Sequence, residues 1–127
     1  MHELGIVFHI INTVERVGQE NNLTSVSSVT LQLGEVSGVI QKELTDCWNW
    51  AVRKTELLRD ARLNIETIPA YTMCEDCKNT YETVSYGRIC PYCGSERTFL
   101  IQGNEIYLKE IAASEDGGMT DGQDKDN

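Results

Sequence analysis

The feature that most constrains this chain is a pair of Cys-x2-Cys motifs, Cys74/Cys77 and Cys90/Cys93, with twelve residues between them. This spacing lets one tight turn present two sulfurs to the same ion, at Zn–S distances of about 2.3 Å. Four thiolates complete a tetrahedron and leave no position for water or substrate, which is typical of a structural zinc site. An iron–sulfur cluster can use the same ligands, and a dithiol redox site needs only one pair. Two matched pairs favour structural zinc.

The residues around the cysteines suit tight turns. Pro91 pre-sets φ inside the second motif, and Gly94 can take the positive φ that aims backbone N–H groups at the sulfurs. Asn79, after the first motif, tolerates the same conformation. A domain below about 40 residues rarely holds a core unaided, whereas structural zinc supplies roughly 10–16 kcal/mol. We therefore expect residues 70–100 to form a zinc-ribbon domain.

Charge narrows the choice of partners. The chain has 20 Asp and Glu against 11 Lys and Arg, a formal net charge of −9, so its surface repels nucleic-acid phosphates and anionic membranes. The cysteine segment is not basic either, because Lys78, Arg88 and Arg97 are balanced by four acidic residues. Residues 114–127 carry five acids and one lysine, which predicts a disordered acidic tail. We expect neither nucleic acid nor membrane as a partner.

The segments that flank the cysteine motifs carry helix and strand periodicities. Apolar residues recur at helical spacing over 3–18 and 42–58, although part of 3–18 also alternates as a strand would. Apolar and polar residues alternate over 26–33, 62–68 and 105–111, which predicts three strands. We expect an α+β fold in which two helices pack on a small three-stranded sheet that carries the inserted zinc ribbon.

This pattern divides the chain into three parts. The expected parts are an α/β domain of residues 1–69 plus 101–113, the zinc ribbon of 70–100 and the tail of 114–127. The fifth cysteine, Cys47, falls beside the apolar face of the second predicted helix, and we interpret it as a packed, inert thiol.

The start of the chain, Met1-His2-Glu3, offers a second kind of metal site. A free α-amine, the amide nitrogens of residues 2 and 3 and the His2 imidazole can all reach one ion, and such an all-nitrogen set suits square-planar Ni(II) or Cu(II). Amide ligation requires loss of the amide proton, so this site would weaken as the pH falls. A helical rise of ~1.5 Å per residue places His9 roughly 10 Å from His2. We therefore interpret His9 as a residue of a helix face.

Catalytic and membrane functions find little support. The sequence offers no Ser/His/Asp set, phosphate-binding glycine loop or H-E-x-x-H motif. Its longest apolar run, around Leu4–Ile11, is much shorter than the ~20 residues that span a bilayer, and it lacks the flanks of a signal peptide. We expect a cytoplasmic protein that is not an enzyme.

Several motifs together resemble one family. They are Met1-His2-Glu3, Leu33-Gly-Glu-Val-Ser-Gly-Val39, Ala61-Arg-Leu-Asn-Ile-Glu66 followed by Pro69, the two cysteine pairs with Cys-Pro-x-Cys-Gly, and Gly103-Asn-Glu-Ile-Tyr-Leu-Lys-Glu-Ile111. Over residues 1 to about 111 the chain resembles the HypA/HybF family, the nickel metallochaperones of [NiFe]-hydrogenase maturation.

The resemblance implies a division between two metals. Nickel, a transferable cargo, would bind the His2 imidazole with backbone nitrogens of Met1, His2 and Glu3, while structural zinc would bind Cys74, Cys77, Cys90 and Cys93. The partners implied are the nickel-handling GTPase of hydrogenase maturation, the hydrogenase large-subunit precursor, urease maturation proteins in some organisms, and a second copy of the chain. The zinc region contains no histidine, so we do not expect a nickel ligand from it.

Two other functions remain open at this stage. The chain could be a structural zinc-ribbon module for protein interaction or regulation with no nickel role, or a thiol–disulfide enzyme that uses one cysteine pair. The module would keep zinc and bind no nickel at its N-terminus. The enzyme would carry reactive thiols rather than four that are silenced by metal.

Overall fold

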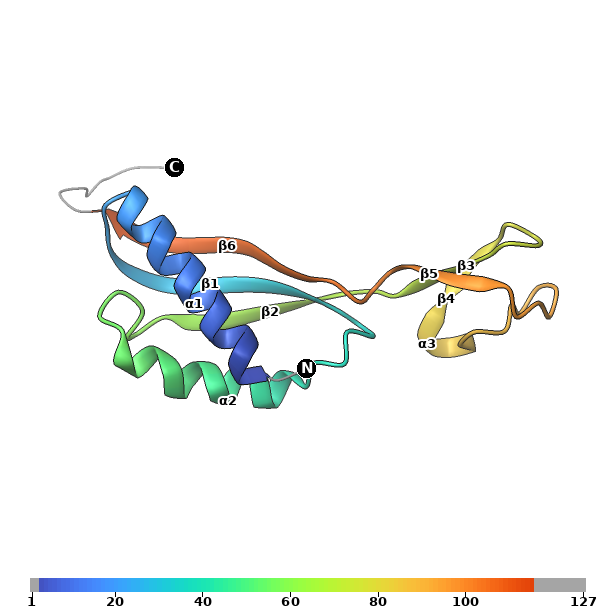
Figure 1. Cartoon of the computed structure of the whole chain (residues 1–127), viewed down its shortest axis with the longest axis horizontal. Helices are drawn as coiled ribbons and strands as arrows, with labels where there is room; N and C mark the ends of the chain where they lie inside the picture. The colour runs from blue at the N-terminus through green and yellow to red at the C-terminus, as the bar shows by residue number, and fades with distance from the viewer. Residues whose placement is uncertain (1–2, 116–127) are drawn as a thin grey trace. The chain divides into compact units, whose positions relative to one another are not determined.

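The structure, a computed structural model, describes residues 3–115 of the 127-residue chain. Its elements, in order, are α1 (Glu3–Glu20), β1 (Leu23–Gly34), α2 (Gln41–Ala51), a 3-10 turn (Val52–Lys54), β2 (Arg62–Ile68), β3 (Tyr71–Cys74), β4 (Thr80–Glu82), α3 (Thr83–Tyr86), β5 (Thr98–Gln102) and β6 (Ile106–Glu115) (Figure 1). They form two three-stranded sheets, ordered β2-β1-β6 and β4-β3-β5. By contacts, the described residues divide into an α/β unit (3–31, 40–64 and 108–115) and a cysteine unit (32–39 and 65–107).

The α/β unit buries the apolar stripes that the sequence periodicity predicted. Helix α1 buries Val7, Ile10, Ile11 and Val14, and helix α2 buries Leu44, Trp48 and Ala51. On β1, Val29 and Leu31 are fully buried, so the core lies between the two helices and this sheet. The predicted α+β class, with two helices on a three-stranded sheet, is confirmed, and so is the helical interpretation of residues 3–18.

The second helix is shorter than predicted. We expected a helix over 42–58, but α2 ends at Ala51 and a 3-10 turn ends at Lys54. Thr55 has an extended backbone, and its Oγ1 accepts a hydrogen bond from the Leu58 N–H at 3.1 Å. Threonine side chains that bond nearby backbone groups compete with the helix. This turn buries Leu58 fully. Buried positions therefore continue at helical spacing beyond the end of α2, which is why the pattern predicted a longer helix.

Two strands extend beyond their predicted ends. Strand β1 begins at Leu23 instead of residue 26, directly after Asn22, whose φ of 56° ends the preceding helix in the left-handed conformation that asparagine tolerates. Strand β6 continues to Glu115, two residues into the expected acidic tail. The remainder of that tail, residues 116–127, lies outside the described residues.

The cysteine unit is a small sheet with one short helix. Strand β3 pairs antiparallel with β4 and with β5, and Met73 is the partner of Thr80 on one side and Phe99 on the other. The sequence predicted no strand inside 70–100, because strands of three to five residues are too short for periodicity to detect. A turn from β1, residues 32–39, belongs to the same unit.

This turn bonds to both chain segments that lead into the small sheet. The N–H of Glu35 donates to the Ile68 carbonyl at 2.8 Å, and the N–H of Val36 donates to the Gly103 carbonyl at 2.8 Å. The Glu35 carboxylate also accepts the Ala70 N–H at 2.9 Å. The backbones approach so closely that a Cβ on Gly34 would lie 2.0 Å from the Gly103 oxygen. Only glycine fits at position 34.

We therefore expect Gly34→Ala to destabilise the protein by about 1–3 kcal/mol, the usual cost of forcing extra volume into a packed site. Equilibrium urea unfolding followed by far-UV circular dichroism and by tyrosine fluorescence measures this change. Gly5→Ala is the control, since a Cβ on Gly5 meets nothing within 4 Å and alanine favours a helix. A Gly34→Ala protein as stable as wild type would contradict the close approach.

Candidate metal centre

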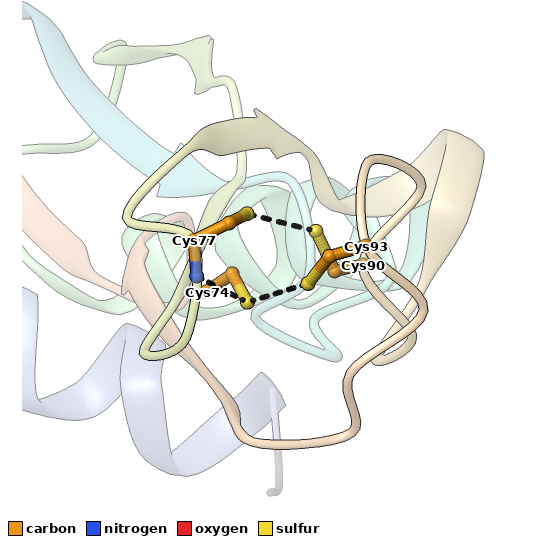
Figure 2. A group of neighbouring side chains, drawn as sticks. All are labelled: Cys74, Cys77, Cys90 and Cys93. Atoms are coloured by element: carbon orange, nitrogen blue, oxygen red, sulfur yellow. Dashed lines mark hydrogen bonds between the residues drawn. The ribbon is translucent and has the colours of Figure 1, made fainter.

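The four predicted zinc ligands converge on one point. The Sγ atoms of Cys74, Cys77, Cys90 and Cys93 all lie within 4.8 Å of one another (Figure 2). The Cys74–Cys93 and Cys77–Cys90 sulfur pairs are each 3.5 Å apart, and none of the four cysteines is in a disulfide. Four sulfurs at ~2.3 Å from a tetrahedral ion are ~3.8 Å apart, so the cluster has the size for one such ion. The bridged irons of an iron–sulfur cluster would need the sulfurs farther apart.

Two similar loops carry the sulfurs. We call them the first loop (residues 74–79) and the second loop (90–95). In each, the N–H of the first cysteine donates to the carbonyl five residues on, Cys74 to Asn79 at 3.0 Å and Cys90 to Ser95 at 2.9 Å. The residue after the second cysteine has positive φ, 78° at Gly94 and 65° at Lys78. Gly94 was predicted, but the first loop uses Lys78 rather than Asn79. The loop geometry requires this conformation despite the steric cost to lysine.

Asparagine 79 has a different role from the one expected. Its side-chain amide donates to the Cys77 Sγ at 3.4 Å. Backbone N–H groups also point at sulfur: that of Cys77 lies 3.5 Å from the Cys74 Sγ, and that of Tyr92 lies 3.4 Å from the Cys90 Sγ. Such donors stabilise thiolates, which are the form of cysteine that binds metals.

These donors and the crowding of the sulfurs act on the thiol pKa values in opposite directions. The Cys77 N–H lowers the pKa of Cys74 to about 6. The Asn79 N–H lowers the pKa of Cys77 in the same way. The Ser95 N–H lowers the pKa of Cys93, but the Cys74 sulfur, desolvation and the other two sulfurs together raise it to about 12. Four thiolates this close together therefore need a cation among them.

The cysteines also make up most of the core of their unit. Cys74 is 0 % exposed and Cys90 is 2 % exposed, and they form one core cluster with the buried Tyr81. Cys77 packs against this cluster. The Tyr81 hydroxyl donates to the Gly87 carbonyl at 2.9 Å. Because so little apolar surface is buried here, the fold of this unit depends on what the sulfurs bind.

The residues predicted for the second metal are only partly within the described chain. Met1 and His2 lie outside it. Glu3 begins α1, and its carboxylate accepts the Ile40 N–H, 3.2 Å away, at the N-cap of α2. His9 is exposed on α1, and Cys47 is half-buried on α2 and is not a member of the group of four clustered sulfurs.

A family model described as "Hydrogenase/urease nickel incorporation, metallochaperone, hypA" matches residues 1–113. The chain belongs to the HypA family. Among relatives of this HypA-family chain, the hydrogenase maturation factor HypA of Streptomyces avermitilis is 33% identical over 113 residues, 87% of this chain and 86% of the relative. The maturation factor HybF of Klebsiella pneumoniae is 29% identical over 111 residues, 87% of this chain and 97% of the relative.

A solved structure shares the fold of this HypA-family chain. The solution structure of the nickel metallochaperone HypA from Helicobacter pylori superposes with a TM-score of 0.69 at 23% identity, covering 91% of this chain and 100% of that one. The family assignment makes the chain a nickel-incorporation metallochaperone of hydrogenase maturation. Within residues 3–115, no helix is both long and apolar enough to cross a membrane.

Proposed function

We propose that this HypA-family chain carries Ni(II) on the His2 imidazole and the backbone nitrogens of Met1, His2 and Glu3, and delivers it for [NiFe]-hydrogenase maturation. In the same proposal, Cys74, Cys77, Cys90 and Cys93 hold a structural zinc ion. The nickel-handling GTPase and the hydrogenase large-subunit precursor would receive the cargo or assist its transfer, and urease maturation proteins are a further recipient.

The observation that carries this proposal is the closure of the sulfur site. Four cysteines whose sulfurs lie within 4.8 Å of one another can fill all four positions of a tetrahedral zinc ion, which would leave none for a second, transferable ion. Within residues 3–115 no other group of three or more His, Cys, Asp or Glu side chains converges on one point. A nickel-incorporation protein built this way needs its cargo site elsewhere, and the Met-His-Glu start offers the nitrogen ligands that Ni(II) prefers.

The contact of Glu3 supports a cargo site at this place. Its carboxylate is bonded to the backbone at the N-terminus of α2, where negative charge is favourable and where no α2 side chain caps the helix. The first turn of α1 is thus attached to the N-terminus of α2 at Glu3, the last residue of the proposed ligand set. Glu3 would contribute its backbone nitrogen to nickel while its carboxylate stays with Ile40.

The decisive experiment is a Ni(II) titration of tag-free protein that begins at Met1, with zinc measured by elemental analysis. Wild type should bind one Ni(II) per chain, and His2→Ala should abolish that binding and leave zinc unchanged. His9→Ala is the matched control, because His9 is the chain's other histidine, and it should bind nickel as wild type does. Binding should weaken as the pH falls, since amide ligation requires proton loss.

Each other result has a clear meaning. Undiminished nickel binding by His2→Ala would contradict the proposed ligands. Zinc without nickel in wild type would favour a structural zinc-ribbon module instead. Loss of both metals in His2→Ala would show that the two sites are not separate. Addition of two residues before Met1 should weaken nickel binding as His2→Ala does, because it moves the free α-amine away.

A further inference from the structure

The two loops that carry the sulfurs are also joined by side chains that are not ligands. We call Glu75, Asp76, Ser95 and Arg97 the inter-loop bridge. The Ser95 hydroxyl donates to the Asp76 carboxylate at 2.5 Å. The Arg97 guanidinium lies 3.2 Å from the other Asp76 oxygen and 3.4 Å from the Glu75 carboxylate. The Ser95 hydroxyl also accepts the Arg97 N–H at 3.0 Å, so all four residues are connected.

The bridge ends on residues that lie inside the two loops. Asp76 lies between Cys74 and Cys77 in the first loop, and in the second loop the Ser95 carbonyl accepts the Cys90 N–H at 2.9 Å. The sulfurs of Cys74 and Cys93, one from each loop, lie 3.5 Å apart. The Asp76–Ser95 hydrogen bond therefore connects the residue between the two ligands of the first loop to the residue that holds the backbone of Cys90 in the second.

The members of the bridge do not contribute equally. The Arg97 side chain is 70% exposed, and the carboxylates it faces are 46% and 43% exposed, so solvent screens these two ion pairs strongly. The Ser95 hydrogen bond to a charged acceptor is the stronger and more directional link.

We propose that Asp76 and Ser95 are positioning residues that hold the two loops together around the bound metal and slow its release. Partners that orient the ligands of a metal site typically change metal affinity about 10–100-fold when removed. The inference rests on the zinc assignment in the proposed function and is independent of the nickel site.

The test measures zinc transfer from the full-length, zinc-loaded protein to the chromogenic chelator 4-(2-pyridylazo)resorcinol. Ser95→Ala and Asp76→Ala should each release zinc about tenfold faster than wild type or more. Ser95→Thr keeps the hydroxyl and should restore slow release. Ser85→Ala is the matched control: its hydroxyl bonds Glu82 at 3.4 Å in the same unit, and its release rate should equal that of wild type.

Two further measurements separate positioning from simple loss of fold. In Co(II)-substituted protein, Ser95→Ala should shift the thiolate-to-cobalt charge-transfer bands, because the Ser95 backbone that holds Cys90 loses its link to Asp76 in the opposite loop. Ser85→Ala should leave the bands unshifted. In the double variant Asp76→Ala/Ser95→Ala, zinc release should be no faster than in the faster single variant, since both changes remove the same bond.

The outcomes distinguish this inference from the function on which it depends. Release rates within twofold of wild type in both single variants, or effects that multiply in the double variant, would overturn the bridge. Unshifted cobalt bands in Ser95→Ala would also overturn it. Wild-type protein that retains no zinc would instead refute the zinc assignment itself, and the bridge with it.

Discussion

Replacement of Cys90 by serine should remove zinc from the protein and unfold the cysteine unit. Cys90 is 2 % exposed, and the core cluster of its unit consists of Cys74, Tyr81 and Cys90 with Cys77 packed against them. Three ligands of the tetrahedron would remain, and structural zinc contributes roughly 10–16 kcal/mol to the folding of such units. So small a cluster cannot replace that contribution.

Elemental analysis should show less than a tenth of the wild-type zinc in Cys90→Ser, and the amide NMR signals of residues 71–102 should collapse to unfolded positions. The helical circular dichroism of α1 and α2 should persist, because their core contains none of these cysteines. Cys47→Ser is the matched control, since Cys47 lies outside the sulfur cluster and should keep full zinc. Dispersed amide signals in zinc-free Cys90→Ser would contradict a fold that depends on metal.

Replacement of Trp48 by alanine should destabilise the α/β unit by about 3–5 kcal/mol, the range for large aromatic side chains in cores. Trp48 is the largest fully buried side chain of the described residues, and its indole N–H donates to the Ala61 carbonyl at 3.0 Å. The substitution leaves a cavity and a buried carbonyl without its donor, which adds to the cost. Urea unfolding followed by helical circular dichroism measures this loss.

Trp50 supplies an internal control two residues away on the same helix. Its side chain is 46% exposed, and the Lys54 ammonium lies 3.8 Å from its ring centroid. Such an exposed cation–π contact contributes about 0.5–1 kcal/mol, so Trp50→Ala should cost no more than that. Equal destabilisation by Trp48→Ala and Trp50→Ala would mean that α2 packs on the sheet through a different face.

The elements that the sequence predicted well are those whose signal is local. Val7, Ile11 and Val14 form the buried face of α1, because an α-helix places residues three and four positions apart on the same side. The Cys-x2-Cys spacing likewise specifies two sulfurs on one turn. Local spacing was misleading where a side chain competed with the backbone, as Thr55 does beyond the end of α2.

The first cysteine loop shows the limit of residue preference. Asparagine tolerates positive φ better than lysine, yet Lys78 occupies that position and Asn79 donates to the Cys77 sulfur. The position directly after the second cysteine, together with the hydrogen bonds that Cys74 makes within its loop, fixes the backbone conformation at this residue. These constraints override the intrinsic preference of lysine for negative φ. Gly94 in the second loop satisfies both requirements, and there the prediction from sequence is confirmed.

The sequence by itself determined the spacing of the two sulfur pairs and the apolar stripes of two helices and three strands, and it predicts nitrogen ligands at the start of the chain. Only the tertiary structure decided which partners those pieces meet. It brings Asp76 to Ser95, 19 residues away, and Glu35 to Ala70, 35 residues away. Spacing along a chain describes the neighbours that one turn or one strand brings together. Contacts between distant segments depend on how whole loops and sheets pack around a metal or a core. Short-range sequence patterns do not encode those contacts.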